Sequence, residues 1–155
     1  MQDGGLTRGR PAATVLLLRD GAEGLEVFMV IRHHAIDFAS GAAVFPGGRL
    51  EEADREIAAT LSSDPVDAFR VAAVREAFEE CGVLLATEAA GGPLIGGARM
   101  KAVEDGHRAE LNAGARGFAT ILHEEKLTPA LDRMVHFAHW ITPEGRPKRF
   151  DTHFF

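Results

Sequence analysis

Three carboxylates crowd the end of one predicted helix, and their placement constrains the fold of this chain more than any other feature. Residues 65–81 are predicted to be helical, and Glu76, Glu79 and Glu80 stand there at i, i+3 and i+4. Like charges at this spacing destabilise a helix by roughly 0.2–0.5 kcal/mol per pair. The negative end of the helix dipole lies in the same turn. We therefore expect a cation beside these acids.

The limits of this helix and its buried side follow from the residue types. Asp64 and Pro65 suit the cap and first turn of a helix, and Gly82 suits the left-handed residue that closes one. Apolar residues recur at spacings of three and four and predict the side that faces the core. They are Val71, Val74, Phe78 and Cys81.

Two runs of the sequence together resemble a known family. Residues 75–82 read Arg-Glu-x-x-Glu-Glu-x-Gly, and residues 45–48 read Phe-Pro-Gly-Gly. The first is similar to the core of the Nudix box and the second to the run that opens it. A lone Glu-x-x-Glu-Glu is typical of a solvated helix face, whereas both runs together favour a Nudix hydrolase.

The chain departs from the family pattern between these two runs. The usual box has a short, fixed spacing there and one further glutamate, but the segment between Arg49 and Asp64 is longer, so the box carries an insertion. Asp54 takes the place of that glutamate when counted from Gly48, and Asp67 when counted back from Arg75. Both alternatives stay open from the sequence.

The resemblance implies a site and a reaction. It implies metal-dependent hydrolysis of a pyrophosphate bond in a nucleoside diphosphate derivative, with Mg²⁺ or Mn²⁺ as cofactor. Hard cations of this kind take oxygen ligands. The implied metal ligands are Glu76, Glu79 and Glu80, the implied catalytic residues are these three with Arg75, and the implied substrate-binding residues are Arg32, Gly47 and Gly48.

A second resemblance concerns the substrate. Arg32, Gly41 and the Phe-Pro-Gly-Gly run partly match a signature of coenzyme A diphosphatases, although Asp37 stands where that signature has an arginine. The insertion and residues 140–155 resemble the corresponding segments of proteins in the same branch. We expect coenzyme A or acyl-coenzyme A as substrate. The alternatives are an ADP-ribose or NADH pyrophosphatase, a nucleotide-sensing module without activity, and a structural domain with an acidic helix.

Composition limits the partners of the chain. Its 155 residues, of which 46% are hydrophobic, are enough for one domain, expected over residues 11–155 after a flexible segment 1–10. A net charge of −6 and scattered basic residues argue against binding nucleic acid. The sequence shows no apolar run long enough to span a membrane. We expect a cytoplasmic protein, and a homodimer stays open.

The remaining sequence predicts an α/β fold. Residues 13–19 and 25–32 are apolar runs around a turn, which predicts a hairpin covered on both faces. Residues 42–45 and 131–141 are expected as strands and residues 97–112 and 117–126 as helices. Residues 46–48 are expected to end the first of these strands, and their glycines allow either close approach of the main chain to a ligand or a plain turn. The family implies an α/β/α sandwich with a mixed sheet between helices. It also implies a further strand and helix, so we expect a C-terminally truncated piece.

The single cysteine and the seven histidines are predicted to have structural rather than catalytic or metal-binding roles. Cys81 lies beside the glutamates, which raise a thiol pKa, so a buried small hydrophobe is expected rather than a nucleophile. The histidines show no pairing with cysteine that resembles a zinc site. His136 and His139, at i and i+3 of the expected strand, should point to opposite faces.

Overall fold

The fold is described by a computed structural model, which covers residues 9–31 and 41–155. A four-stranded sheet has the order β6-β1-β10-β9. β1 runs parallel to β10, and the other two pairs are antiparallel, so the sheet is mixed. Its strands are β1 (Arg10–Thr14), β6 (Gly47–Arg49), β9 (Ala138–Ile141) and β10 (Phe150–Phe154). The predicted α/β class with a mixed sheet is confirmed.

Helix α2 (Asp67–Cys81) packs on β1 and β6 and holds the centre of the core. Val71, Val74 and Phe78 are fully buried, as their spacing predicts. The helix begins two residues later than expected, because Asp64 accepts a hydrogen bond from the Val66 amide and holds a turn there. It ends at the expected glycine, since Gly82 has φ 72°.

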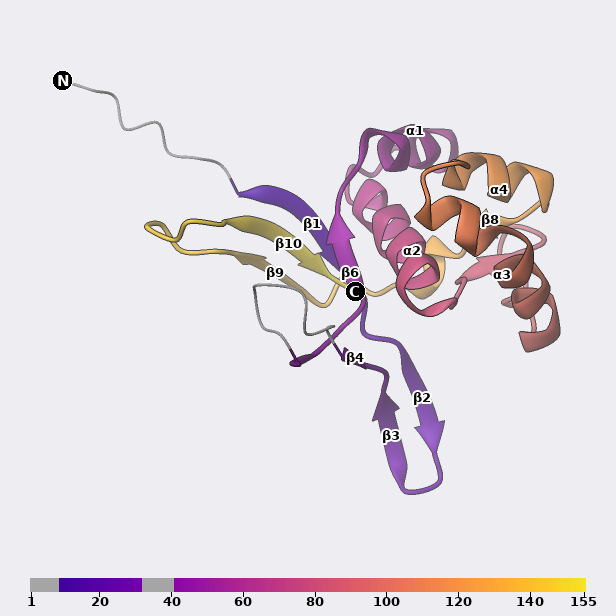
Figure 1. Ribbon diagram of the computed structural model, residues 1–155, viewed down its shortest axis with the longest axis horizontal. Helices are drawn as coiled ribbons and strands as arrows, with labels where there is room; N and C mark the ends of the chain where they lie inside the picture. Colours follow the sequence, from indigo (N-terminus) through magenta and orange to yellow (C-terminus); the bar gives the residue numbers. More distant parts are fainter. Residues whose placement is uncertain (1–8, 32–40) are drawn as a thin grey trace.

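The other helices gather around α2 on one side of the sheet (Figure 1). Helix α1 contacts α2 and α4, and α3 contacts α2. A short ladder of β7 and β8 links the segments before α3 and after α4. These elements are α1 (Glu52–Leu61), β7 (Ala86–Thr87), α3 (Gly97–Asn112), α4 (Phe118–Glu124) and β8 (Thr128–Pro129). Within the described ranges no helix meets the length and hydropathy needed to cross a membrane.

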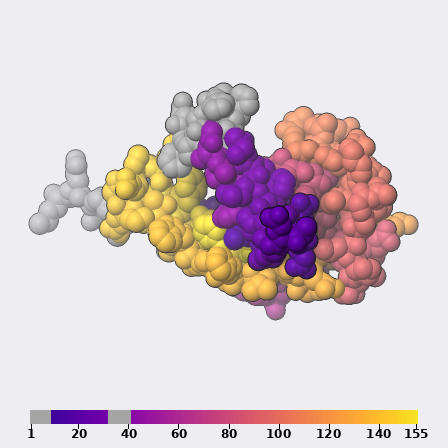
Figure 2. Space-filling view, turned by 90° about the horizontal axis from the view of Figure 1, so that it is seen from below, coloured from indigo at the N-terminus to yellow at the C-terminus, as the bar shows by residue number. Residues whose placement is uncertain are grey.

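The predicted N-terminal hairpin forms only over residues 18–27, where it is largely exposed, because residues 13–14 of the first predicted run belong to β1 of the main sheet. Among the described strands β2 (Leu18–Gly21) pairs only with β3 (Gly24–Val27), and the hairpin projects from the body of the molecule (Figure 1). Figure 2, seen from below, shows its indigo atoms in front of the rest of the molecule. Leu25 is 70% exposed. The expectation of burial on both faces is wrong, because a continuous apolar run shows only that a strand can be buried. Beyond it, β4 (Val30–Ile31) pairs with β5 (Ala43–Val44).

Two further expectations are corrected. Gly47 and Gly48, expected to end a strand, instead form the sheet strand β6 with Arg49, and neither has a positive φ. The strand expected at residues 131–141 is interrupted: a 3₁₀ helix, η1 (Leu131–Arg133), is followed by Met134, which is buried in the core. The carbonyl of Met134 accepts a hydrogen bond from Arg70 on α2, at 3.1 Å, so the chain turns inward before β9 begins.

Candidate functional site

The guanidinium of Arg75 lies buried at the centre of the candidate site. Its Nε and Nη2 donate to the two carboxylate oxygens of Asp54, at 2.9 and 3.0 Å. Nη1 donates to Glu76 at 3.0 Å and to Glu79 at 3.2 Å, and Nη2 also donates to the carbonyl of Arg49 at 2.9 Å. All five N–H groups of a guanidinium are thereby used. We call Arg75, Asp54, Glu76 and Glu79 the Arg75 cluster.

The structure decides between the two aspartates that the sequence left open. Asp54 is fully buried against Arg75, whereas Asp67 pairs with Arg70 at the other end of α2. Asp54 also accepts a hydrogen bond from the Glu51 amide at 2.9 Å, at the start of α1. The inserted helix therefore supplies the acid that orients Arg75. Asp54 lies three residues after the cap residue Glu51 and forms a capping box with it. The spacing is that of a capping box, but Glu and Asp stand in place of the usual Ser/Thr and Glu/Gln, so the sequence carries only a weak signal for the start of α1.

The glutamates of α2 approach the glycines of β6. The amide of Gly47 donates to Glu80 Oε2 at 3.1 Å. A Cβ atom at Gly48 would lie 2.2 Å from a carboxylate oxygen of Glu76, and one at Gly47 would lie 2.4 Å from the carbonyl oxygen of Ala13. Glycine is required at both positions because of this close approach, not because of turn geometry.

Helix α3 supplies a second cation at the end of α2. Arg108 donates to the carbonyl oxygens of Glu79 at 3.0 Å and Glu80 at 2.8 Å, and Asn112 donates to that of Glu79 at 3.2 Å. These contacts satisfy carbonyls left without partners at a helix C-terminus. Part of the positive charge expected beside these acids therefore comes from the protein itself, through Arg75 and Arg108.

Burial and charge act in opposite directions on the ionisable groups of the cluster. Burial disfavours the charge on Arg75, but the hydrogen bond and charge of Asp54, with the charges of Glu76 and Glu79, outweigh it and raise the pKa of the guanidinium. Burial raises the pKa of Glu76 to about 7, and the charge of Glu79 adds to this against the lowering effect of Arg75. The cluster thus has an excess of acids and one carboxylate that ionises with difficulty.

Cys81 is half-buried and free, and its thiol lies 2.9 Å from the carbonyl oxygen of Ala77. Burial raises the pKa of this thiol, which agrees with the structural reading. Arg32, expected at the substrate, lies outside the described residues.

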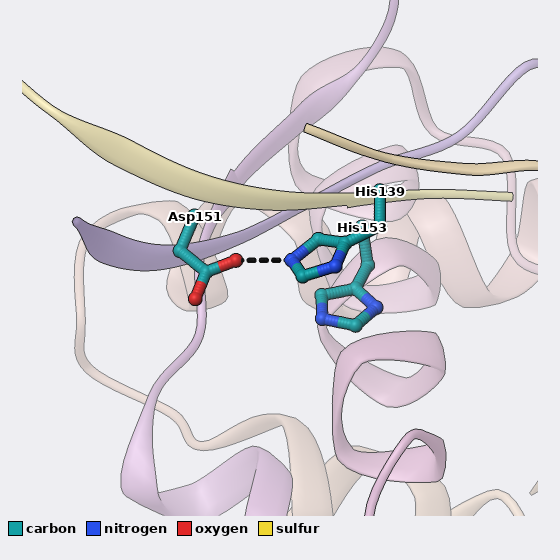
Figure 3. Close-up of side chains that lie close together, drawn as sticks. All are labelled: His139, Asp151 and His153. Atoms are coloured by element: carbon teal, nitrogen blue, oxygen red, sulfur yellow. Dashed lines mark hydrogen bonds and ion pairs between the residues drawn. The ribbon is translucent and has the colours of Figure 1, made fainter. Parts of the chain in front are cut away.

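A group of possible metal ligands also lies outside the glutamates of α2. One set of three has ligand atoms all within 4.8 Å of one another, and it consists of His139, Asp151 and His153 (Figure 3). The larger cavity of the two described, between α1 and α4, is lined mostly by apolar side chains and includes no residue of the Arg75 cluster.

Comparison with known proteins decides the family. The family model of the NUDT19 Nudix domain matches residues 55–155. The chain belongs to the Nudix hydrolase family. This Nudix chain has 29% identity over 181 residues to "Acyl-coenzyme A diphosphatase NUDT19" of Homo sapiens, covering 86% of the chain and 48% of that protein. A nudix hydrolase of Caenorhabditis elegans is 29% identical over 150 residues, which are 94% of this chain and 43% of the relative.

A solved structure agrees with the Nudix assignment. The crystal structure of a NUDIX hydrolase from Alicyclobacillus acidocaldarius superimposes with a TM-score of 0.70 at 30% identity, covering 96% of this chain and 69% of that one. The predicted membership in the coenzyme A diphosphatase-like branch is confirmed. The chain spans less than half the length of the two curated relatives described above.

The buried Asp54–Arg75 pair gives a first prediction, on the stability of the fold. We expect Asp54→Asn to lower the free energy of unfolding by roughly 3–5 kcal/mol, because it removes the fully buried carboxylate that pairs with the Arg75 guanidinium and leaves only the partly exposed Glu76 and Glu79 beside it. Asp105→Asn removes an exposed pair with Lys101 and should cost less than about 1 kcal/mol. Urea unfolding of both variants measures this. Equal, small losses would show that the buried pair does not hold the two helices together.

The raised pKa of Glu76 gives a second prediction, on how the stability of the fold depends on pH. The pKa of this carboxyl is about 7 in the folded state against an ordinary 4.5. The folded state therefore binds the proton more tightly, and stability falls as pH rises through this window. In chelator, Glu76→Gln should gain stability relative to wild type between about pH 5 and pH 8, by roughly 1–3 kcal/mol. Glu56→Gln, exposed on α1, is the control and should follow the wild-type curve. A constant offset for Glu76→Gln across this range would contradict the raised pKa.

Proposed function

We propose that this Nudix chain hydrolyses a pyrophosphate bond in a nucleoside diphosphate derivative, with coenzyme A or an acyl-coenzyme A as the preferred substrate. The observation that carries the proposal is the Arg75 cluster. A buried guanidinium holds Glu76 and Glu79 at the end of α2, and Glu80 lies beside them against β6. This is an acid-rich site on rigid elements, which suits chemistry that depends on positioning and charge.

The donor set fits a hard divalent cation. Glu76, Glu79 and Glu80 offer only carboxylate oxygens, which Mg²⁺ and Mn²⁺ accept as ligands. We propose these three residues as the ligands. A divalent cation bound there would offset the charge of the diphosphate and favour deprotonation of an attacking water.

The other residues of the site would position these acids. Arg75 donates to Glu76 and Glu79 and is itself fixed by Asp54, so it restrains two of the three glutamates from the protein side. The Arg108 contacts fix the last turn of α2. Gly48 leaves the space that Glu76 occupies, and the Gly47 amide is engaged by Glu80. We therefore assign Gly47 and Gly48 to support of the acids as well as to approach of the substrate.

Support for a coenzyme A substrate comes from the relatives in the coenzyme A diphosphatase-like branch. The human relative is named an acyl-coenzyme A diphosphatase, and the matching family model is that of its Nudix domain. The sequence adds Arg32 and the Phe-Pro-Gly-Gly run, while Asp37 departs from the coenzyme A signature. ADP-ribose and NADH are the competing substrates.

A third prediction tests this function. We expect Glu79→Gln and Glu80→Gln each to lower kcat at least a hundredfold with the fold intact, because losing one electrostatic contact to the reacting group costs on the order of 10²–10³ in rate. Phosphate-containing products are measured with coenzyme A, acyl-coenzyme A, ADP-ribose, NADH and dinucleoside polyphosphates, in Mg²⁺ and in Mn²⁺. Glu56→Gln, the exposed glutamate on α1, is the matched control and should keep the wild-type rate.

Each outcome of the substrate panel leads to a different conclusion. Turnover of coenzyme A above every other compound supports the preferred substrate, and higher turnover of ADP-ribose or NADH transfers the preference to those. No turnover with any compound, together with binding of one of them, would replace the enzyme by a nucleotide-sensing module. Near-wild-type rates in both glutamine variants would contradict the assigned site.

A further inference from the structure

Three metal-binding side chains meet on one face of the sheet, at the edge formed by β9 and β10. Asp151 and His153 stand two residues apart on β10 and so share a face. His139 of β9 lies directly opposite His153 in the antiparallel register. The ligand atoms of all three lie within 4.8 Å of one another (Figure 3). Strand pairing alone places them there, since opposite residues have Cβ atoms about 4.5–5.5 Å apart.

Neighbouring side chains hold the two imidazoles in place. The His139 ring is bonded through Nε2 to Asp151, and Nδ1 of His153 lies 3.1 Å from Nε2 of His136. The His153 ring stacks on His139 at 4.2 Å between centroids and on Phe69 of α2 at 4.0 Å. The expectation that His136 and His139 face apart is wrong, because His136 precedes β9 and both rings stack on His153.

This histidine group is separate from the acids of the Nudix box. His153 stacks on Phe69, near the start of α2, whereas Glu76, Glu79 and Glu80 follow seven to eleven residues later on the same helix. At 1.5 Å per residue, this is roughly 10–16 Å along the helix axis. The two sets of ligands can therefore be filled independently.

We propose that His139, Asp151 and His153 bind one transition-metal ion of the Zn²⁺ class, at a site distinct from the Nudix glutamates. Two imidazoles and one carboxylate suit Zn²⁺, Co²⁺ or Ni²⁺, whereas Mg²⁺ takes oxygen ligands. Tetrahedral zinc with bonds near 2.0–2.2 Å needs ligand atoms about 3.3–3.6 Å apart. The widest separations must therefore close by about an ångström, while the hydrogen bond between His139 and Asp151 opens to admit the ion. His136 contacts Nδ1 of His153 and would orient its ring. A metal-binding imidazole usually has such a hydrogen-bonding partner on its other nitrogen.

The exposure of these groups suits metal binding. The side chains of His139 and Asp151 are 41% and 35% exposed, so an ion can reach them from solvent. The alternative is a plain surface ion pair between His139 and Asp151, which is worth at most about 1 kcal/mol. In that alternative the His153 ring is held by its stacking on His139 and Phe69, and no stoichiometric Zn²⁺ binding is expected.

The bound ion would fasten β9 to β10. β10 lies between β1 and β9 in the sheet, and β9 is an edge strand whose described residues are all exposed. An ion bound by the folded state alone stabilises that state by mass action. The inferred role is therefore structural, and it requires no participation in hydrolysis.

The test is Zn²⁺ binding to the whole chain in excess Mg²⁺, by competition with a chromogenic chelator. We expect about one Zn²⁺ per chain, with a Zn²⁺-dependent rise in melting temperature. His139→Asn and Asp151→Asn, both at accessible positions, should each weaken binding at least about tenfold. His123→Asn is the matched control, because His123 is exposed on α4, and it should bind as wild type does. Co²⁺ in place of Zn²⁺ should give visible absorption that is lost in the same two variants.

Two outcomes would overturn the site: no stoichiometric Zn²⁺ on the wild type, or equal binding in His139→Asn, Asp151→Asn and the control. Glu79→Gln separates this question from the proposed function. Zn²⁺ binding that survives in Glu79→Gln supports a second site, whereas Zn²⁺ binding lost there and kept in His139→Asn would place the ion at the glutamates and contradict the proposal.

Discussion

The buried contact between Arg75 and Asp54 is the interaction on which the rest of the site depends. It joins α2 to the inserted helix α1, and the same guanidinium reaches the Arg49 carbonyl at the end of β6. Two glutamates of α2 take its remaining donors. A buried guanidinium is costly unless each donor is satisfied, and here every donor has an acceptor. One side chain therefore fixes a strand, two helices and two acids relative to one another.

The insertion in the Nudix box is thus part of the site rather than an appendage. Counting residues left two aspartates as candidates, and only the packing of α1 against α2 separates them. The close approach of β6 to α2 depends on the two glycines there, which leave room for the Ala13 carbonyl and the Glu76 carboxylate. Sheet, inserted helix and box helix therefore meet at a single point, and the acids are gathered at that point.

Local patterns predicted those elements whose burial follows from their own periodicity. The stripe of α2, its closing Gly82 and the helix at residues 97–112 are confirmed. Long-range packing could not be predicted from these patterns. The apolar hairpin is exposed, because a run of apolar residues does not specify which element packs against it. The three histidines around β9 and β10 meet through strand register and an inward turn at Met134, which spacing along the chain does not reveal. Arg108, too, reaches α2 only through the docking of α3.

The most direct test of the central claim is the hydrolytic rate of Asp54→Asn beside Asp67→Asn, at a temperature where circular dichroism shows both folded. If Asp54 orients Arg75 and through it the glutamates, Asp54→Asn should lower kcat by at least about tenfold, the usual cost of losing a residue that orients a ligand. Asp67→Asn alters only the pair with Arg70 and should stay close to the wild-type rate. A folded Asp54→Asn variant with wild-type kcat, or equal losses in the two variants, would contradict the account.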